Sequence, residues 1–250
     1  MHYKKTYLKQ VILRLDFSRL AALQAEQETP FTADLRTQYP EVTATPVTQF
    51  SLMVAPVGVN LGQQGAGWMR VHKAQDVARS VTLAPEFVAI EYGVEAYKHF
   101  DELRDQVGFV LGSFRKHFGA VPFTRIGLRY INEITLTEGA PLDWDGLINP
   151  SLVTAVKAGM HDGLRLARSA HQMVAIKDGI SVVLNYGVNN PDFPNPVARR
   201  QFILDLDCYI SSLVESGEAE QRIRDVNKLA EDVFENSIGD GLRDKMERVQ

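Results

Sequence analysis

The chain has 250 residues, of which 45% are hydrophobic and 23% are charged, and its formal net charge is −4. These values are typical of a globular protein that buries a substantial core, and they argue against a disordered or fibrous chain. A dedicated nucleic-acid-binding protein usually carries a strong basic excess, so we do not expect nucleic acid as a partner.

Cys208 is the single cysteine, so the chain cannot form an internal disulfide, which fits a reducing compartment. The basic residues near the N-terminus are not followed by the apolar run of a signal peptide. The sequence contains no run of 18 apolar residues, so no transmembrane helix is predicted. We therefore expect a soluble protein without a membrane segment, located in the cytoplasm.

The N-terminal part of the chain is predicted to be mostly β-strand. Residues 9–17 alternate in polarity and place Val11, Leu13, Leu15 and Phe17 on one side, which is the pattern of a half-buried strand. The other elements expected before residue 97 are a short helix over 21–28, strands over 47–57, 68–72, 77–83 and 87–92, and a glycine-rich loop over 58–67.

The clearest helix is predicted over residues 97–118, where apolar residues recur at three- and four-residue steps. Gly119 is a suitable residue to end it. A long strand is expected over 122–136. Residues 138–150 contain two prolines and two glycines, a composition typical of a linker.

The C-terminal part follows the same order, with strands that precede a long helix. Strands are predicted over 164–177 and 180–188, joined by a hairpin turn at Lys177-Asp178-Gly179. The elements expected after them are a turn-rich loop over 189–196, a strand over 200–210, a helix over 217–235 and a short helix that ends near Met246.

The expected fold class is α+β, with an antiparallel or mixed β-sheet backed by two long amphipathic helices. The linker divides the chain into an N-terminal α+β half, residues 1–140, and a C-terminal α+β half, residues 151–250. The halves are expected to pack closely, and they can also be counted as one domain over 1–250. Their similar order of elements suggests two related halves, although the residues themselves do not match.

Several predicted strands carry ionisable residues on the side opposite their apolar residues. Arg125 and Arg129 are four residues apart on one strand, and Asp205 and Asp207 are two apart on another, so each pair shares a face. Paired guanidinium groups bind carboxylates or phosphates, and an Asp-x-Asp pair can hold a divalent cation. These four residues are the candidate ligand-binding site. The alternative is a ladder of cross-strand salt bridges on a solvated sheet face.

The sequence motifs of serine nucleophiles, phosphate-binding loops and zinc sites are absent. Cys208 lies in phase with an apolar row, which predicts a buried, unreactive thiol. His161 and His171 could approach each other in the fold. No histidines have the spacing of a metal-binding motif, however, so we favour histidines that lie on the surface or are hydrogen-bonded. We therefore assign no catalytic residue, no metal and no cofactor.

Three aromatic residues lie in predicted loops or beside them: Trp68, Trp144 and Phe193. Gathered on the surface, they would mark a patch for a protein partner. The alternative, which the pattern favours, is that they point inward and anchor their loops.

Four segments of the chain are distinctive: YKKTYLKQVILRLDF near the N-terminus, RIGLRYINEI at 125–134, LDLDCY at 204–209 and KLAEDVFENSIGDGLRDKM at 228–246. Together they resemble a sporadically distributed family of uncharacterised bacterial proteins of about this size, and RIGLRYIN is the most specific part. The resemblance covers nearly the whole chain and implies a stand-alone bacterial protein. It implies no catalytic residue, and a patchy distribution suits an accessory or mobile-element role.

These observations favour a non-enzymatic binding or interaction protein, in which a helix-backed sheet presents a polar face to a protein or to an anionic small molecule. The alternative is a metal-dependent enzyme or sensor that acts on a phosphorylated small molecule or a nucleotide. In that alternative Asp205 and Asp207 would hold the metal, and Arg125 and Arg129 would hold the anion.

Overall fold

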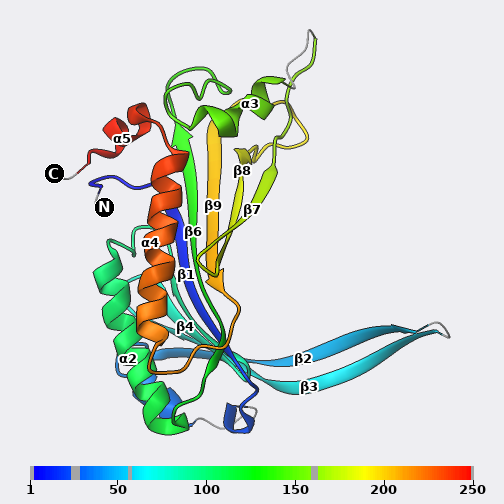
Figure 1. Cartoon of the computed structure of the whole chain (residues 1–250), viewed down its shortest axis with the longest axis vertical. Coiled ribbons are helices and arrows are strands. Elements are labelled where there is room, and N and C mark those ends of the chain that lie inside the picture. The colour runs from blue at the N-terminus through cyan, green and yellow to red at the C-terminus, as the bar shows by residue number, and fades with distance from the viewer. Residues whose placement is uncertain (1–2, 24–28, 56–57, 159–162, 249–250) are drawn as a thin grey trace.

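The computed structural model describes residues 3–23, 29–55, 58–158 and 163–248, and at 48–55, 58–66, 155 and 158 it describes the backbone alone. Within these residues the chain is α+β, with one nine-stranded sheet and five α-helices (Figure 1). Each described strand pair is antiparallel. Of the two expected sheet types, antiparallel and mixed, the sheet is therefore antiparallel.

The strands are β1 (Leu8–Phe17), β2 (Glu41–Ala55), β3 (Gly58–Lys73), β4 (Arg79–Ala84), β5 (Phe87–Tyr92), β6 (Phe123–Leu136), β7 (His171–Lys177), β8 (Ile180–Val188) and β9 (Arg200–Ile210). The helices are a short 3₁₀ helix η1 (Ala21–Leu23), α1 (Pro30–Leu35), α2 (Phe100–Phe118), α3 (Pro150–Ala158), α4 (Ala219–Ser237) and α5 (Asp240–Met246). No described helix is both long enough and apolar enough to cross a bilayer.

The strand order in the sheet is β2-β3-β4-β5-β1-β6-β9-β8-β7. The first strand of the chain therefore lies in the middle, between β5 and β6. Strand β6 pairs with β9 from Ile126 opposite Ile210 to Leu136 opposite Arg200. The sheet is thus continuous across the two ranges that the sequence suggested as halves.

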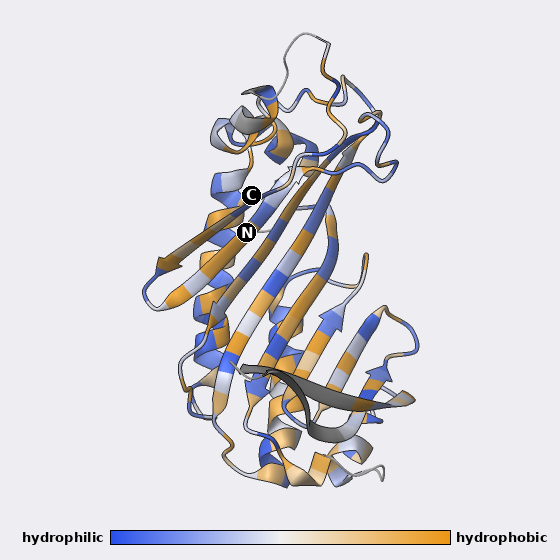
Figure 2. Cartoon of the chain, turned by 90° about the vertical axis from the view of Figure 1, so that its right-hand side faces the viewer, coloured by the Kyte–Doolittle hydropathy of each residue, from blue (hydrophilic) through white to orange (hydrophobic). Residues whose placement is uncertain are grey.

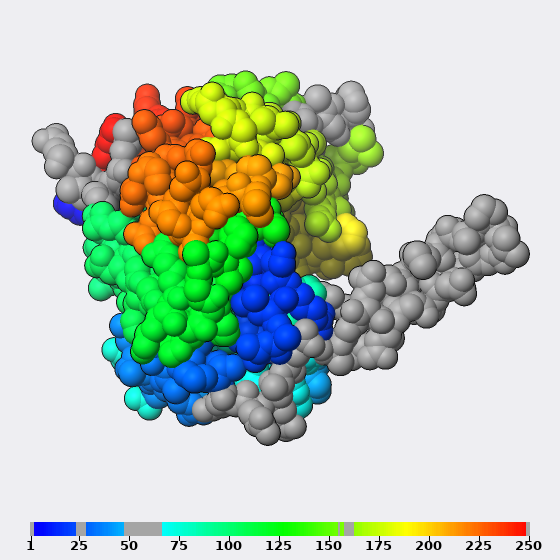
Figure 3. Space-filling model, turned by 60° about the horizontal axis from the view of Figure 1, so that its bottom comes forward, coloured from blue at the N-terminus to red at the C-terminus, as the bar shows by residue number. Residues whose placement is uncertain are grey.

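Helices α2 and α4 lie on the same face of the sheet (Figure 1), next to each other (Figure 3). The opposite face, called the open face below, shows hydrophilic and hydrophobic residues that alternate along its strands (Figure 2). The predicted alternation in β1 is confirmed, because Val11, Leu13, Leu15 and Phe17 are buried on the helix-covered side. Burial of one face of each strand fixes the pairing register, since a slip of one residue would expose these side chains.

Two hydrophobic clusters fill the helix-covered side. In the first, the ring of Phe114 from α2 lies 5.0 Å from that of Phe17 and 5.6 Å from that of Phe31, between centroids. In the second, the Trp144 ring lies 5.2 Å from the Phe202 ring. Trp144 is only 1% exposed whereas Phe193 is 58% exposed, so the three loop aromatics do not form one surface patch, and Trp144 anchors its loop inward.

The prediction of a glycine-rich loop over 58–67 is wrong, because these residues belong to strand β3. They pair with β2 in a ladder that runs from Glu41 opposite Lys73 to Ala55 opposite Gly58. Only residues 70–73 of β3 also pair with β4. Residues 45–55 and 58–69 therefore form a two-stranded arm that projects from the open-face side of the molecule (Figure 1).

Two other boundaries differ from the prediction. Helix α2 begins at Phe100 rather than at residue 97, because His99 is its N-cap and accepts a hydrogen bond from the Glu102 N–H at Nδ1. Strand β7 begins at His171 rather than at residue 164. Of the short helix predicted over 21–28, residues 21–23 are helical and 24–28 lie outside the described residues.

The predicted hairpin turn between β7 and β8 is confirmed. Asp178 and Gly179 both have positive φ, 52° and 78°. Two successive positive φ values are the signature of the type I′ turn that suits the twist of a hairpin.

Candidate functional site

The four charged residues singled out from the sequence lie on β6 and β9, which are neighbours in the sheet. Arg129 donates from Nε and Nη2 to the two carboxylate oxygens of Asp205, at 2.7 and 2.6 Å. Arg125 donates from Nη2 to Asp207 Oδ2 at 2.9 Å. The structure therefore brings the two pairs together, and it matches each guanidinium with a carboxylate.

The ion pairs continue across the open face. Arg14 contacts Asp16 at 2.7 Å, and Asp16 lies 4.0 Å from Arg125. Burial raises the pKa of Asp207 against the opposing effect of Arg125. The arrangement is a cross-strand ladder of salt bridges, which was the alternative interpretation of these four residues. An anion could reach the guanidinium groups only in competition with their present carboxylate partners.

The described histidines and Cys208 do not form a cluster that could bind a metal ion. Among the described residues, no group of three or more His, Cys, Asp and Glu side chains is placed to hold a metal ion. His161 lies outside the described residues, and His171 hydrogen-bonds to Ser169 Oγ at 2.7 Å beside an open cavity of about 400 Å³. Cys208 is buried as predicted, and burial raises the pKa of its thiol to about 12.

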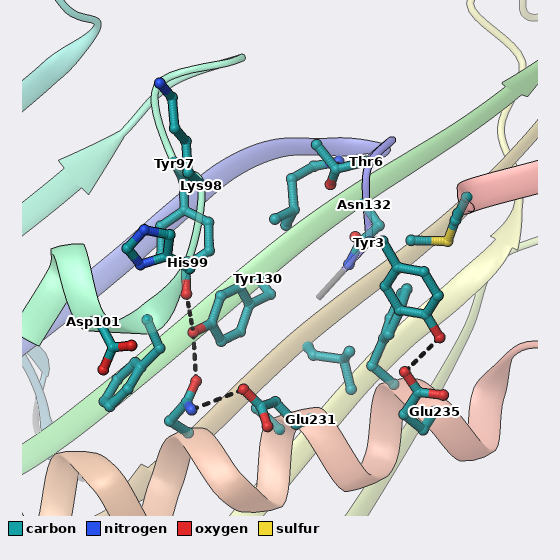
Figure 4. Close-up of a pocket in the computed structure, with 17 residues that line it drawn as sticks. Tyr3, Thr6, Tyr97, Lys98, His99, Asp101, Tyr130, Asn132, Glu231 and Glu235 are labelled. Carbon is teal, nitrogen blue, oxygen red and sulfur yellow. Dashed lines mark hydrogen bonds between the residues drawn. The ribbon is translucent and has the colours of Figure 1, made fainter. Parts of the chain in front are cut away.

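A different cavity lies on the helix-covered side of the sheet, with a volume of about 310 Å³. Its walls come from the N-terminal segment, the segment before α2, strands β6 and β9, helix α4 and the end of α5 (Figure 4). We call it the helix-side pocket; it is lined by Tyr3, Thr6, Leu8, Tyr97, Lys98, His99, Phe100, Asp101, Tyr130, Asn132, Leu206, Asn227, Ala230, Glu231, Phe234, Glu235 and Met246.

Tyr130 and Asn132 reach the pocket from β6 because alternate residues of that strand face the helices. Asn132 is 3% exposed, and its Nδ2 donates to the backbone oxygen of Leu204 at 3.2 Å. Its Oδ1 accepts no hydrogen bond from any described residue. The Asn132 side chain therefore lies at the wall of the pocket and is anchored to β9.

A chain of hydrogen bonds crosses the pocket from the segment before α2 to α4 (Figure 4). The hydroxyl oxygens of Tyr97 and Tyr130 are 3.1 Å apart, and Tyr130 donates to Asn227 Oδ1 at 2.6 Å. Asn227 in turn donates from Nδ2 to Glu231 Oε1 at 3.1 Å. Burial raises the pKa of both tyrosines, so their hydroxyls stay protonated at neutral pH.

A second polar group closes the opposite end of the pocket. Tyr3 donates to Glu235 Oε1 at 2.6 Å, and Arg243 donates from Nε to Glu235 Oε2 at 3.2 Å. Burial, followed by the hydrogen bond to Glu235, raises the pKa of Tyr3 to about 12. These bonds tie the N-terminal segment to α4 and α5.

Sequence reasoning placed Tyr130 on a core face and did not identify the pocket. One signal was present: the four segments that stand out as distinctive in the sequence all contribute lining residues, among them Tyr3, Tyr130, Leu206 and Glu231. Those segments are far apart in the chain and meet only when the sheet and α4 have formed.

Comparison of the chain with models of known protein families, and with curated proteins, found no match.

Proposed function

We propose that this chain is a non-enzymatic binding protein that holds a small organic molecule in the helix-side pocket. The observation that carries the proposal is a cavity of about 310 Å³ in which polar groups are held at fixed positions, from Tyr97 through Tyr130 to Asn227. A few fixed polar groups in a mainly apolar cavity are typical of a site for a small molecule.

The dimensions and the chemistry of the pocket support the same proposal. Its volume of about 310 Å³ lies at the lower end of the range for small-molecule sites. Its polar groups are held by neighbours, as Tyr130 is by Asn227 and Tyr3 is by Glu235. Groups fixed in this way recognise a shape and a hydrogen-bond pattern without having to move.

This proposal keeps the class of protein expected from the sequence and moves its ligand site. The guanidinium groups of Arg125 and Arg129 already have carboxylate partners on the open face. The helix-side pocket, in contrast, is a cavity that combines apolar side chains with fixed polar groups.

A thermal-shift screen of small amines, carboxylates, sugars and nucleotides tests the proposal, because a ligand of the folded state raises the melting temperature. Thr6→Trp, at an exposed lining position, should fill the mouth of the pocket and abolish the shift. Lys4→Trp, an exposed neighbour outside the lining, should leave the shift intact. Absence of any shift, or a shift that persists in Thr6→Trp, would contradict the proposal.

A second proposal concerns the arm formed by residues 45–55 and 58–69, which we propose contacts a protein partner together with the open face. Residues 42–69 contain no Asp, Glu, Lys, Arg or His. Within the described part of the chain the arm strands pair only with each other, and an isolated two-stranded ladder is marginally stable in water. A partner chain would provide further contacts.

Photo-crosslinking in cells tests this second proposal. A crosslinking residue at Ile203, which lies on the open face, should give a product of defined mass. The same residue at Arg224, an exposed position on α4, serves as the control. Equal labelling at both positions, or none at Ile203, would count against the proposal.

A further inference from the structure

Strand β7 is the last strand on one side of the sheet, so one of its edges has no neighbour among the described strands (Figure 1). Every residue of the strand from Gln172 to Lys177 is exposed. The strand nevertheless carries apolar side chains, since Val174 is 60% exposed and Ile176 is 74% exposed. Together with Met173, they are three of the eight exposed large hydrophobic residues in the described part of the chain. An exposed apolar edge of this kind is a template for pairing with another strand.

The hydrogen bonds of the hairpin show which backbone groups of β7 point outward. The Ser169 N–H donates to the Val188 backbone oxygen at 3.3 Å, which continues the ladder between β7 and β8. Because hydrogen-bonded and non-hydrogen-bonded pairs alternate in an antiparallel ladder, the odd-numbered residues of β7 direct their N–H and C=O groups toward β8. The N–H and C=O groups of Gln172, Val174 and Ile176 therefore point away from β8, to the outer edge of the sheet.

The central residues of β7 carry none of the features that usually prevent edge pairing. Residues 172–176 contain no charge and no proline, and their register with β8 has no bulge. Charged side chains, prolines and bulges are the means by which proteins commonly keep an edge strand from pairing with another chain. The composition of this edge therefore favours pairing.

The outward groups define a twofold register. With Val174 opposite Val174 of a second copy, Gln172 lies opposite Ile176 of that copy, and each outward N–H and C=O group meets a partner. On the other face of the strand, Met173 lies opposite Ala175 of the second copy, a large side chain beside a small one. In this register the two copies match in backbone hydrogen bonds and in side-chain size.

The same register brings an exposed side chain of one copy to a cavity of the other. Gln172 lines the open cavity of about 400 Å³, and its Nε2 donates to Asn185 Oδ1 at 2.8 Å. Ile176 faces the same side of the sheet as Gln172, because the two residues are four apart on one strand. Ile176 of the second copy would therefore lie beside this cavity, whose lining includes Tyr186 and Ile203.

From the outward backbone groups, the register and the cavity, we propose that β7 pairs with β7 of a second copy of this chain, antiparallel and about a twofold axis at Val174. The sheet would then continue from one copy into the other. Two strands of seven residues bury less surface than a standard interface of about 1,600 Å², so we expect a weak dimer that depends on concentration. The contact uses neither the helix-side pocket nor the arm, and it is independent of both proposed functions.

Sedimentation velocity at concentrations from about 5 to about 500 µM tests the proposal, because small interfaces associate weakly. The unsubstituted chain should approach twice its mass at the highest concentration. Val174→Lys places two ammonium groups opposite each other at the twofold axis and should weaken the association by about tenfold or more. Val94→Lys makes the same change at another exposed valine, between β5 and α2, and should leave the association unchanged.

A pair of cysteine variants tests the register. In the proposed dimer the two Cα atoms at position 174 are about 5.5 Å apart, which suits a disulfide, whereas those at position 176 are more than about 13 Å apart. Under mild oxidation Val174→Cys should form a disulfide-linked dimer. Ile176→Cys should form about tenfold less or none, although this position is the more exposed of the two. The natural thiol of Cys208 is buried and does not compete.

Three results would overturn the proposal. A chain that remains monomeric at about 500 µM would show that this edge does not pair with a second copy. A dimer that Val174→Lys leaves intact would use another surface. Equal cross-linking of the two cysteine variants would indicate random collision instead of the twofold register.

Discussion

The ion pair between Arg129 and Asp205 joins an accessible cation to a buried anion. The Arg129 side chain is 42% exposed and the Asp205 side chain is 10% exposed. A second donor, Asn185 Nδ2, lies 3.3 Å from Asp205 Oδ2. Removal of one partner therefore has different consequences for the two charges. Water can solvate the arginine without its partner, but it hardly reaches the aspartate.

We predict that Arg129→Ala lowers the free energy of unfolding by about 1–3 kcal/mol, because it leaves the Asp205 carboxylate with fewer donors. Urea denaturation measures the change. Arg222→Ala, which removes an exposed ion pair with Asp225 on α4, should cost less than about 0.5 kcal/mol. Equal losses in the two variants would show that the burial of Asp205 has no energetic consequence.

The thiol of Cys208 is predicted to be unreactive in the folded protein. It is buried between the sheet and the helices, and burial, with a smaller effect of Asp207, raises its pKa to about 12. Because the thiolate is the reactive form, a thiol reagent at pH 8 should modify the native protein slowly and the urea-unfolded protein rapidly. Native labelling at the unfolded rate would contradict the placement of this side chain.

At the scale of single residues, strand periodicity predicts which side a residue faces but not what it meets there. It correctly placed Cys208 on the buried side and Arg125 with Arg129 on one face. It also placed Tyr130 toward the core side. The bond from Tyr130 to Asn227 joins residues 97 positions apart, and no local pattern in the sequence encodes such a contact.

At the scale of elements, the arm shows where composition is misleading. Residues 58–67 contain four glycines and no charge, which is typical of a loop. They form a strand because β2 supplies the backbone partners from Ala55 to Val47. That information lies in the other strand, so a reading of residues 58–67 alone could not provide it.

Removal of the arm is predicted to leave the body of the protein stable. Residues 48–66 would be replaced by Asn-Gly, a two-residue turn that keeps Val47 opposite Gly67. Because the deleted strands pair with no other strand that the structure describes, the free energy of unfolding should change by less than about 1 kcal/mol. A loss of more than about 3 kcal/mol in urea denaturation would mean that the arm is part of the cooperative core.

At the scale of the whole molecule, the two ends of the chain meet beside the helix-side pocket. The Lys5 N–H donates to the Met246 backbone oxygen at 3.0 Å, and Tyr3 forms a β-bridge with Arg248. The pocket therefore depends on the first and last segments of the chain at once. Such contacts between distant segments form late relative to local ones, because closing a long loop costs entropy first.

The same architecture buries several tyrosines, and this makes stability depend on alkaline pH. Burial raises the pKa of Tyr39 to about 12 and raises the pKa of Tyr92, Tyr97 and Tyr130 as well. A tyrosine in the unfolded chain ionises at about pH 10. Since the folded-state pKa lies above the unfolded one, the stability from these groups is fully present below pH 10 and is lost as the pH rises through the folded-state values.

We therefore predict that the melting temperature is steady up to about pH 9 and falls steeply between about pH 10 and pH 12. Phenolate absorbance of the folded protein should show that only part of its eight tyrosines ionise near pH 10. Tyr39→Phe should reduce the fall, because it removes one of the groups whose ionisation favours the unfolded state. A single titration of all eight tyrosines near pH 10, with the fold intact, would contradict the burial of the Tyr97–Tyr130 pair on which the pocket depends.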